Sequence, residues 1–498
     1  MSLAIVQTRA SAGIKAPRVT VETHISNGLP GLSIVGLPET SVKESRDRVR
    51  SALLNTQFEF PARRITINLA PADLPKQGSR FDLAIALSIL AASHQIPSDS
   101  LWQYEFIGEL ALSGELRPVS GILPFALAAQ KANHIVILPT ENAQEAGFNQ
   151  KTIILPAKNI LQICAHLQGR DLLSPFQLSH TATEPRELPD LAEVYGQTHA
   201  KRGLEICAAG RHNLLMVGPP GTGKTMLATR LIGLLPLLSE EQALELAAIR
   251  SMSGQSISLN HWKYPPFRRP HHTASSIALV GGGSPPRPGE ISLAHQGILF
   301  LDELPEFNRH VLEALREPLE SGTITISRAA RQAEFPANFQ LIAAMNPCPC
   351  GYLGSKVHHC VCSPERIQVY RKKLSAPFLD RIDMYLEVNS LPKNYFLQAK
   401  KEESSEIVRL RVKRAQAKQI KNYGQLNHTL SGKVLEKACK LSDKDHRLVE
   451  DALEKFQLSV RAYHRILRIA RTIADLADCE KIKTSHLMEA LSYKFIKK

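Results

Sequence analysis

The sequence predicts an α/β protein in which a parallel β-sheet carries the binding site and a helical region follows it. Apolar runs at residues 213–217, 297–301 and 340–345 have the length and composition of buried strands. Continuous apolar runs of this kind are typical of strands that helices cover on both faces. Each run ends in glycine or in polar side chains. Open α/β sheets bind ligands at the carboxyl ends of their strands, so a site is expected at these three strand ends.

The first run leads into the stretch GPPGTGKT, after which a helix-forming segment begins. This order of strand, glycine-rich loop and helix fits the phosphate-loop motif. Glycines let the backbone N–H groups and the helix N-terminus face a polyphosphate. Lys224 can reach the β and γ oxygens of ATP, and Thr225 can offer its hydroxyl to Mg²⁺. The residues expected to contact the nucleotide are Gly218, Pro219, Pro220, Gly221, Thr222, Gly223, Lys224, Thr225 and Met226.

The other two runs add side chains that suit ATP hydrolysis. The second run ends in Asp302 and Glu303. Asp302 is expected to hold Mg²⁺ through water, and Glu303 to orient and deprotonate the attacking water. The third run ends in Asn346, a polar side chain expected close to the γ-phosphate. Together the three strand ends predict a Mg²⁺-dependent ATPase core, in which Lys224, Glu303 and Asn346 are catalytic residues.

The region before the phosphate loop predicts a separate α/β unit and a linker. Strand patterns occur at 18–22, 32–35, 64–68, 106–110 and 134–138, and helix patterns at 39–57, 81–92, 127–132 and 159–168. The unit carries neither a phosphate loop nor metal-ligand spacing. Residues 169–190 are polar and rich in proline, which predicts a linker.

A polar insertion separates the phosphate-loop helix from Asp302. It begins with Arg268-Arg-Pro-His-His-Thr273 and continues through a glycine-rich stretch to Pro288. Loops held in this way on a rigid scaffold often carry function.

A short hairpin is predicted further along, from residues 322–328 and 331–335. Arg328 and Arg331 lie near its tip, where two arginines add nothing to stability. Contact with an anion such as a DNA phosphate is the favoured interpretation, and simple solvation is the alternative.

Four of the eight cysteines cluster, which suggests a metal site. Two close pairs of thiolates can form a tetrahedral zinc site, although the C-x-C spacing is tighter than the usual C-x₂-C. His358 and His359 are spare candidate ligands. A structural zinc is favoured over free thiols that brace a loop. The expected ligands are Cys348, Cys350, Cys360 and Cys362.

Two arginine-containing segments follow the cysteines. Arg381 is either paired with Asp380 or Asp383 or presented to the ATP of a neighbouring subunit. Residues 399–423 predict a basic amphipathic helix, and residues 425–498 are helical in pattern. A helix at 460–476 aligns three arginines without acidic partners on that face, which predicts that they meet an external anion or a partner subunit. These are Arg461, Arg465 and Arg468.

Charge and composition indicate which binding partners the protein has and in which cellular compartment it is expected. The net charge is +14, and from Leu391 onward the chain has 24 Lys/Arg against 13 Asp/Glu. Such a basic surface commonly meets phosphate backbones, with a solvated helical face as the alternative. No apolar run approaches the length of a membrane span, and the first residues lack the pattern of a signal peptide. A cytoplasmic protein that does not bind membranes is therefore expected.

Five of these motifs resemble one family. GPPGTGKT, LFLDE, MNPCPCG, LDRID and SVRAYHRILRIARTIADL are similar to the ComM/YifB proteins, which are bacterial magnesium-chelatase-like AAA+ ATPases, and the resemblance covers the whole chain. It implies the following organisation: a Lon-protease-like (ribosomal S5 domain 2-like) domain at 1–168, a linker at 169–190, an AAA+ P-loop NTPase α/β core at 191–390, a basic linker helix at 391–424 and a C-terminal helical lid at 425–498.

The resemblance also implies roles for individual residues. Asn346 falls at the sensor-1 position, Arg381 at the arginine finger and Arg461 at sensor 2. The turn at 328–331 resembles the pre-sensor-1 hairpin, and residues 281–292 resemble the helix-2 insert. The family implies a hexameric ring that binds single-stranded, forked or branched DNA. Such a ring would drive branch migration of recombination intermediates during natural transformation.

Two other activities are alternatives to a DNA helicase: a Lon-type protease and the motor of magnesium chelatase. Lon proteases carry their serine in a P-K-D-G-P-S run, whereas here Arg80 stands at the nucleophile's place and Ser79 one residue early. Leu123 stands where Lon has its lysine, so the dyad that such a protease needs is missing. The other rival, the motor subunit of magnesium chelatase, lacks the fused N-terminal domain and the four-cysteine insertion.

Overall fold

The computed structural model describes residues 2–178, 187–255, 257–258, 260–283, 286–328, 331–355, 358–390, 402–456 and 459–494. The chain forms two compact units. The first unit comprises Met1–Glu184 together with Leu244–Trp262, and the second comprises Pro185–Ala243 together with Lys263–Lys498. Each unit has its own hydrophobic core. None of the helices in the described ranges is both long and apolar enough to cross a membrane.

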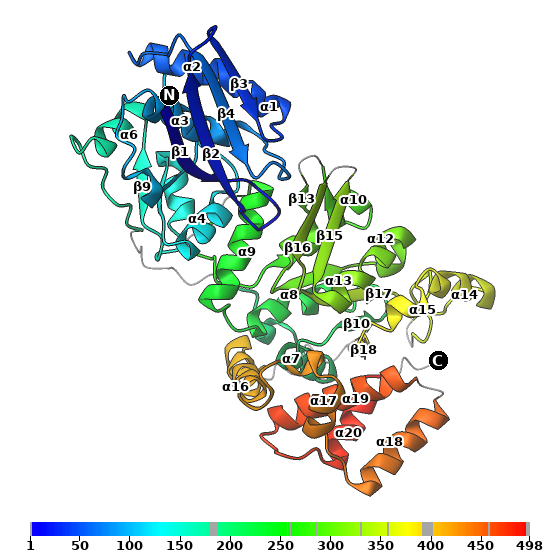
Figure 1. The fold of residues 1–498 in the computed structure, drawn as a ribbon. Coiled ribbons are helices and arrows are strands. Elements are labelled where there is room, and N and C mark those ends of the chain that lie inside the picture. Colours follow the sequence, from blue (N-terminus) through cyan, green and yellow to red (C-terminus); the bar gives the residue numbers. More distant parts are fainter. Residues whose placement is uncertain are drawn as a thin grey trace. The chain divides into compact units, whose positions relative to one another are not determined.

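The first unit is built on a seven-stranded mixed sheet with the order β3-β4-β2-β1-β5-β8-β9. Strands β1, β2 and β4 are antiparallel neighbours, whereas the pairs β3–β4, β1–β5, β5–β8 and β8–β9 are parallel. The strands are β1 (Ser2–Arg9), β2 (Arg18–Ser26), β3 (Gly31–Val35), β4 (Arg64–Ala70), β5 (Tyr104–Phe106), β8 (Ile135–Pro139) and β9 (Ile154–Ala157). The apolar helix α3 (Asp82–Ala92), all of whose residues are buried, packs against β1 and β2 (Figure 1).

The predicted α/β class of this unit is confirmed, and the structure corrects details. The sequence analysis did not identify β1 or β9. The strand predicted at 106–110 is two short strands, β5 and β6 (Glu109–Leu110), of which β6 pairs with β7 (Leu116–Arg117). The helices of the unit within residues 2–178 are α1 (Thr40–Lys43), α2 (Ser45–Asn55), α3, α4 (Ile122–Lys131), α5 (Ala143–Ala146) and α6 (Ile160–Leu167).

A segment from the middle of the predicted nucleotide-binding module packs in the first unit. Helix α9 (Glu240–Ser253) lies mostly within residues Leu244–Trp262 of this segment. Ala247 packs against Leu123 and Phe148. The Trp262 ring meets the Phe148 ring edge-on at 5.5 Å. Apolar burial therefore joins a stretch of about twenty residues to a unit that lies far from it in the sequence.

The second unit contains the predicted parallel sheet. Its five strands have the order β11-β14-β17-β10-β18, and all neighbours are parallel. The strands are β10 (Leu214–Val217), β11 (Phe267–Arg268), β14 (Ile298–Leu301), β17 (Gln340–Met345) and β18 (Met384–Glu387). Strands β10, β14 and β17 are buried along their whole length, as their continuous apolar runs predict.

The part of this unit that precedes residue 391 also contains helices and two hairpins among its described residues. They are α7 (Thr198–Gly210), α8 (Lys224–Leu234), α10 (Ser276–Val280), α11 (Glu290–Leu293), α12 (Arg309–Ala314), α13 (Arg316–Ser321), α14 (Pro364–Lys372) and α15 (Ala376–Leu379), with the hairpins β12 (Gly281–Gly282)–β13 (Arg287–Pro288) and β15 (Thr323–Arg328)–β16 (Arg331–Pro336). The predicted hairpin near residue 328 is thereby confirmed.

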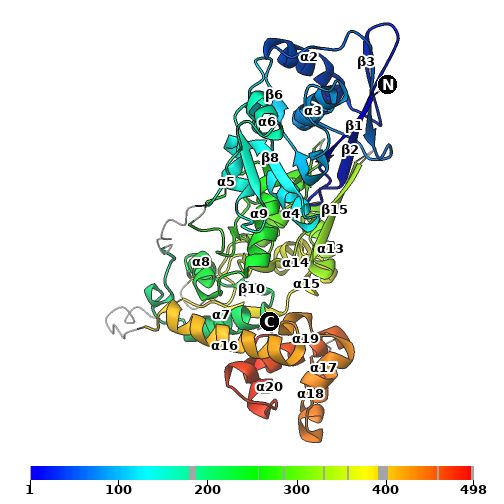
Figure 2. The same cartoon turned by 60° about the vertical axis from the view of Figure 1, so that its left-hand side comes forward.

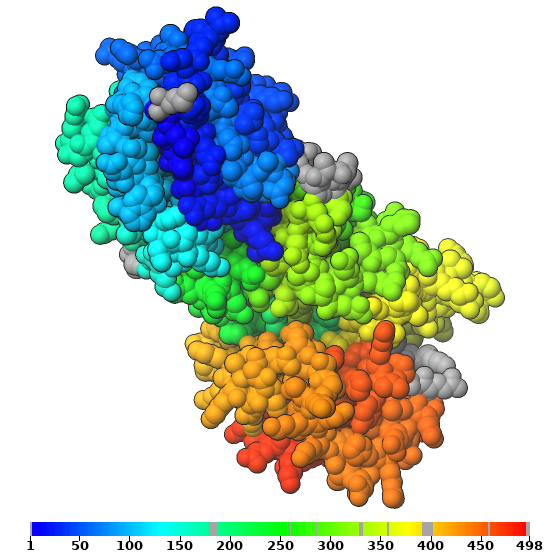
Figure 3. Space-filling view, viewed as in Figure 1, coloured from blue at the N-terminus to red at the C-terminus, as the bar shows by residue number. Residues whose placement is uncertain are grey.

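The C-terminal helical region belongs to the same compact unit. It consists of α16 (Ser405–Tyr423), α17 (Gly432–Ala438), α18 (Asp443–Lys455), α19 (Val460–Leu476) and α20 (Thr484–Ser492). Helix α16 contacts both α7 and α19 (Figure 2). These helices form a continuous surface, orange to red in Figure 3. The helix predicted at 460–476 is confirmed, and the one predicted at 399–423 begins at Ser405, with 391–401 outside the described residues.

Candidate active site

The phosphate loop joins the carboxyl end of β10 to α8, and its shape depends on glycine. Gly221 and Gly223 have φ angles of 75° and 88°, which side chains with a Cβ atom rarely adopt. A Cβ atom on Gly218 would lie 2.1 Å from the carbonyl oxygen of Val388, so only glycine fits there. The loop therefore has the open curvature and the bare backbone that a polyphosphate needs.

Lys224 lies inside this loop. Its Nζ donates to the carbonyl oxygens of Gly218 and Pro219, at 2.7 and 2.8 Å, and to Oδ1 of Asn346, at 3.1 Å. Burial lowers the pKa of Lys224, against the opposing effect of Asp302 and Glu303. The structure thus brings together Lys224 and Asn346, which the sequence predicts at two different strand ends.

Thr225 and Asp302 lie side by side although 77 residues separate them. The Thr225 hydroxyl donates to Oδ2 of Asp302 at 2.8 Å. A hydroxyl and a carboxylate at this spacing are hard oxygen ligands of the kind that Mg²⁺ prefers, so the residues present fit that ion. When bound there, Mg²⁺ neutralises charge on the phosphate oxygens.

Glu303 follows Asp302 and points its side chain to solvent. Its carboxylate is 60% exposed, and its backbone N–H donates to Oδ1 of Asp302 at 3.1 Å. An exposed carboxylate beside the expected Mg²⁺ ligand can reach a water molecule on the phosphate, as the sequence predicts for a general base.

Two residues in the site were not predicted. Arg269 donates from Nη2 to Oδ2 of Asp302 at 2.8 Å, and Nδ1 of His272 lies 3.5 Å from Oε2 of Glu303. Both belong to the polar insertion that begins at Arg268, for which the sequence predicts a function but no contact with Asp302 or Glu303. In the sequence, the consecutive arginines and histidines at 268–272 are the signal that could have identified these residues. They follow the short strand β11, and its parallel pairing with β14 brings them to the edge of the sheet where Asp302 and Glu303 lie.

Arg381 lies at the other edge of the sheet, where the strands begin. It lines a cavity of about 530 Å³ together with Asn213 and Asp383, which precede β10 and β18. Its guanidinium group pairs with Glu320 on α13 and donates to the carbonyl oxygen of Pro377 at 2.6 Å. The phosphate loop follows the opposite end of β10. The expected arginine finger is thus on the side of the unit away from the unit's own nucleotide site.

The three aligned arginines of α19 line the same cavity, and the structure corrects the prediction for one of them, Arg465. Arg465 is buried and donates to Asp380 at 3.1 Å and to the carbonyl oxygen of Ile382 at 2.8 Å. Arg468 donates to the carbonyl oxygen of Leu430 at 2.7 Å. Arg465 therefore holds α19 against the residues before β18 and needs no external anion, whereas the bond of Arg468 stays within the helical region. Arg461 is exposed, and its side chain has no partner among the described residues.

The hairpin β15–β16 ends in the pair Arg328–Arg331. The positions are therefore at the hairpin's tip, as predicted, whereas their side chains and residues 329–330 lie outside what the structure describes.

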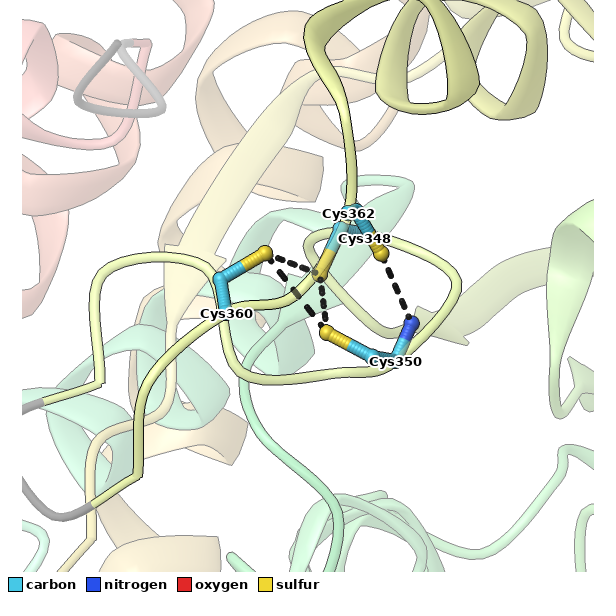
Figure 4. A group of neighbouring side chains, drawn as sticks. All are labelled: Cys348, Cys350, Cys360 and Cys362. Carbon is cyan, nitrogen blue, oxygen red and sulfur yellow. Dashed lines mark hydrogen bonds between the residues drawn. The ribbon is translucent and has the colours of Figure 1, made fainter.

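The four clustered cysteines converge on one point (Figure 4). The Sγ atom of Cys348 lies 3.4 Å from that of Cys350 and 3.6 Å from that of Cys360, and all four sulfur atoms lie within 4.8 Å of one another. Zinc bonded to four thiolates at about 2.3 Å requires sulfur atoms about 3.8 Å apart, so Cys348, Cys350, Cys360 and Cys362 fit a structural zinc site. His358 and His359 are exposed and stand outside the cluster.

The positions that correspond to a Lon-type dyad hold no such arrangement. The Ser79 hydroxyl donates to the carboxylate of Glu109, and Arg80 donates to the carbonyl oxygen of Ser120 at 2.8 Å. Leu123 is fully buried against apolar neighbours. The residues at these positions therefore provide no amine to activate a serine.

Comparison with known proteins identifies related sequences along the whole chain. The family described as "Magnesium chelatase, subunit ChlI" matches residues 190–396, "Subunit ChlI of Mg-chelatase" matches 21–142, and "Magnesium chelatase, subunit ChlI C-terminal" matches 402–494. The chain is 53% identical over 497 residues to the uncharacterized protein YifB of Salmonella typhimurium, covering 100% of this chain and 98% of that protein.

Two further relatives bear on function. The chain is 52% identical over 500 residues to the competence protein ComM of Haemophilus influenzae, covering 99% of this chain and 98% of that protein. It is 27% identical over 186 residues to the chloroplastic magnesium-chelatase subunit ChlI of Nicotiana tabacum, covering 32% of this chain and 44% of that protein.

The cysteine cluster leads to a prediction about metal content. The purified chain is expected to hold about one zinc ion, and the double variant Cys350→Ser, Cys360→Ser to hold none. Because a structural zinc contributes folding free energy, the double variant should unfold about 5–10 °C lower. Elemental analysis and thermal unfolding measure both effects. Cys479→Ser, outside the cluster, is the control and should change neither, and a zinc-free wild-type chain would contradict the prediction.

Proposed function

The chain belongs to the YifB/ComM family of magnesium-chelatase-like AAA ATPases, and on that premise we propose that it is a ring-forming motor that uses ATP to move along DNA. Membership of this family implies ATP hydrolysis with Mg²⁺. The DNA substrate, the ring and the assigned residue roles are parts of the proposal.

The observation that carries the proposal is the separation of two charged sites on one sheet. Lys224 and Asp302 lie where the strands end, whereas Arg381 and Arg461 lie around a cavity where the strands begin. A parallel sheet keeps these two edges apart, so Arg381 can contact a nucleotide only if that nucleotide is bound to another copy of the chain. Repetition of this head-to-tail contact generates a closed ring when the rotation between copies closes.

Within this arrangement each residue has a definite task. Lys224 binds phosphate oxygens, Thr225 and Asp302 hold Mg²⁺, and Asn346 keeps Lys224 and the attacking water in position. Glu303 removes a proton from that water. Arg381 and Arg461 of the adjacent subunit stabilise the charge that develops on the phosphate, an effect worth about 10³–10⁵ in rate for an arginine supplied across an interface.

DNA is the polyanion that the charges favour. The region from Leu391 onward has 24 Lys/Arg against 13 Asp/Glu, although some of this charge is paired internally, as in the pairs Arg411–Glu403 and Lys418–Asp478. The hairpin adds two further arginines, Arg328 and Arg331, as the last pair of its strands before the turn. Contacts to phosphates carry no sequence information, which suits a motor that travels over any sequence. The competence protein named among the relatives agrees with a DNA-related role.

The finer proposal is branch migration. A hexameric ring of this kind, encircling single-stranded, forked or branched DNA, would drive branch migration of recombination intermediates during natural transformation. The competing candidate is a motor that remodels a protein partner, favoured by the similarity of part of the chain to the ChlI subunit of Nicotiana tabacum.

Glu303→Gln is expected to leave ATP binding intact and to lower kcat by at least about 100-fold, because the amide cannot accept the proton of the attacking water. Equilibrium binding of a fluorescent ATP analogue and steady-state phosphate release measure the two effects. Glu306→Gln changes an exposed acid that pairs with Lys373 and should behave like the wild type. Comparable turnover in both variants would remove Glu303 from the role of base.

ATP turnover is expected to rise several-fold with forked or four-way DNA at low salt. DNA binding releases counterions from the phosphates that the protein contacts. The logarithm of DNA affinity should therefore fall linearly with the logarithm of salt concentration, with a slope of about −0.7 to −0.9 per phosphate contacted, and the stimulation should fall with it. Turnover assays across a salt series measure this. A response that is flat with DNA and salt would favour the protein-remodelling motor.

Arg328→Ala combined with Arg331→Ala should keep basal ATPase activity and abolish DNA unwinding, because the hairpin would lose its phosphate contacts while the nucleotide site stays unchanged. Strand-displacement assays on forked DNA, alongside turnover, measure the two activities. Ser327→Ala on the same hairpin is the control. If the double variant still unwinds DNA, the assignment of this hairpin to DNA contact is wrong.

A further inference from the structure

The segment Arg268–Thr273, which we call the RRPHHT segment, runs alongside the acidic end of β14. It follows directly from β11, and the parallel register pairs Arg268 with Leu299. Its side chains therefore reach the same edge of the sheet as Asp302 and Glu303. None of the roles proposed for Lys224, Thr225, Asp302, Glu303 and Asn346 involves this segment.

Arg269 is the member of this segment that touches the nucleotide site. Its Nη2 lies 2.8 Å from Oδ2 of Asp302, the same oxygen that accepts the Thr225 hydroxyl at 2.8 Å. The guanidinium carbon lies 5.6 Å from the centre of the Phe300 ring, a favourable cation–π position. The side chain is still 50% exposed, so it has room to rotate.

The backbone beneath Arg269 is anchored. Arg268 makes two hydrogen bonds of 2.6 Å to the carboxylate of Glu290 on α11. His271 contacts the hydroxyl of Thr273 at 2.8 Å, and His272 lies beside Glu303. Arg269 can therefore leave Asp302 by side-chain rotation, without displacement of the whole segment.

Mg²⁺ held by Asp302 through water would add a second positive charge beside the carboxylate oxygen that Arg269 already contacts. The Thr225 hydroxyl and Asp302 together form the expected Mg²⁺ position, and a guanidinium group already occupies one side of that carboxylate oxygen. Two positive groups at adjacent positions repel each other, and the repulsion is strongest where water is partly excluded. Mg²⁺ binding must therefore weaken or break the contact between Arg269 and Asp302.

We propose that Arg269 is an exchangeable cation: it neutralises Asp302 in the empty site, and it transfers to the terminal phosphate of ATP when Mg²⁺ binds beside Asp302. A planar guanidinium group forms strong, directional hydrogen bonds to phosphate oxygens, and ATP bound at this edge of the sheet would bring a terminal phosphate as a new anion. ADP lacks that phosphate, so Arg269 distinguishes ATP from ADP within one subunit. This role differs from that of Arg381, which acts across an interface.

The proposal rests on the nucleotide site alone and is tested by binding without DNA, so failure of the DNA-motor proposal leaves the result interpretable. The first measurement is the Mg²⁺ concentration that gives half-maximal binding of fluorescent ADP to the full-length chain. Removal of a half-exposed competing ion pair in Arg269→Ala should lower this concentration about fivefold. Arg269→Lys keeps the charge and should stay close to the wild type. Arg309→Ala, an exposed arginine on α12, is the control.

The second measurement compares a non-hydrolysable ATP analogue with ADP at saturating Mg²⁺. Arg269→Ala should weaken binding of the analogue about tenfold or more, the value of a charge-assisted hydrogen bond, and should change ADP binding by less than about twofold. An unchanged or higher Mg²⁺ requirement in Arg269→Ala would overturn the proposal, because Arg269 would then not compete for Asp302. Equal weakening of both nucleotides would overturn it as well, since the contact would not be to the terminal phosphate.

Discussion

The parallel alignment of β10, β17 and β14 is the constraint on which the rest of the second unit depends. Parallel pairing brings the carboxyl ends of these strands to one edge, so residues far apart in the sequence meet there. Lys224, Asn346 and Asp302 come from three different strand ends, yet hydrogen bonds of 3.1 Å and 2.8 Å join Lys224 to Asn346 and Thr225 to Asp302. A shift of one strand by one residue would turn its side chains to the other face and dismantle the site.

The same parallel alignment defines a second, chemically different edge. Asn213 bonds there to the backbone of Leu341 and Arg381, and its own N–H donates to Asp383, which ties the starts of three strands together. Arg465 of α19 fixes the helical region to this edge through Asp380 and the carbonyl oxygen of Ile382. Among the described residues at this edge, Arg461 has no side-chain partner and Arg381 forms an ion pair with Glu320. These are the two side chains that an anion from outside could recruit.

The cysteine cluster contributes to the nucleotide site through packing. It begins two residues after Asn346, and a Cβ atom on Gly351 would lie 2.6 Å from Cδ of Pro220 in the phosphate loop. A metal ion held by the four thiolates would thus stiffen a loop that supports both Asn346 and the phosphate loop.

Local sequence determined the elements and the residue types of the site. The strand, glycine loop and helix around Lys224, the strands before Asp302 and Asn346, the hairpin at residue 328 and the helix at 460–476 all follow from periodicity and turn chemistry, which act between near neighbours. The roles assigned to these residues stay predictions. Tertiary structure alone decided which distant charges meet. Arg269 bonds to Asp302, which lies 33 positions later in the sequence, and Arg465 bonds to Asp380. Residues 244–262 pack in the first unit. Such partners depend on which strands and helices become neighbours in space. Sequence patterns relate only residues that are close in the chain, so they do not predict these contacts.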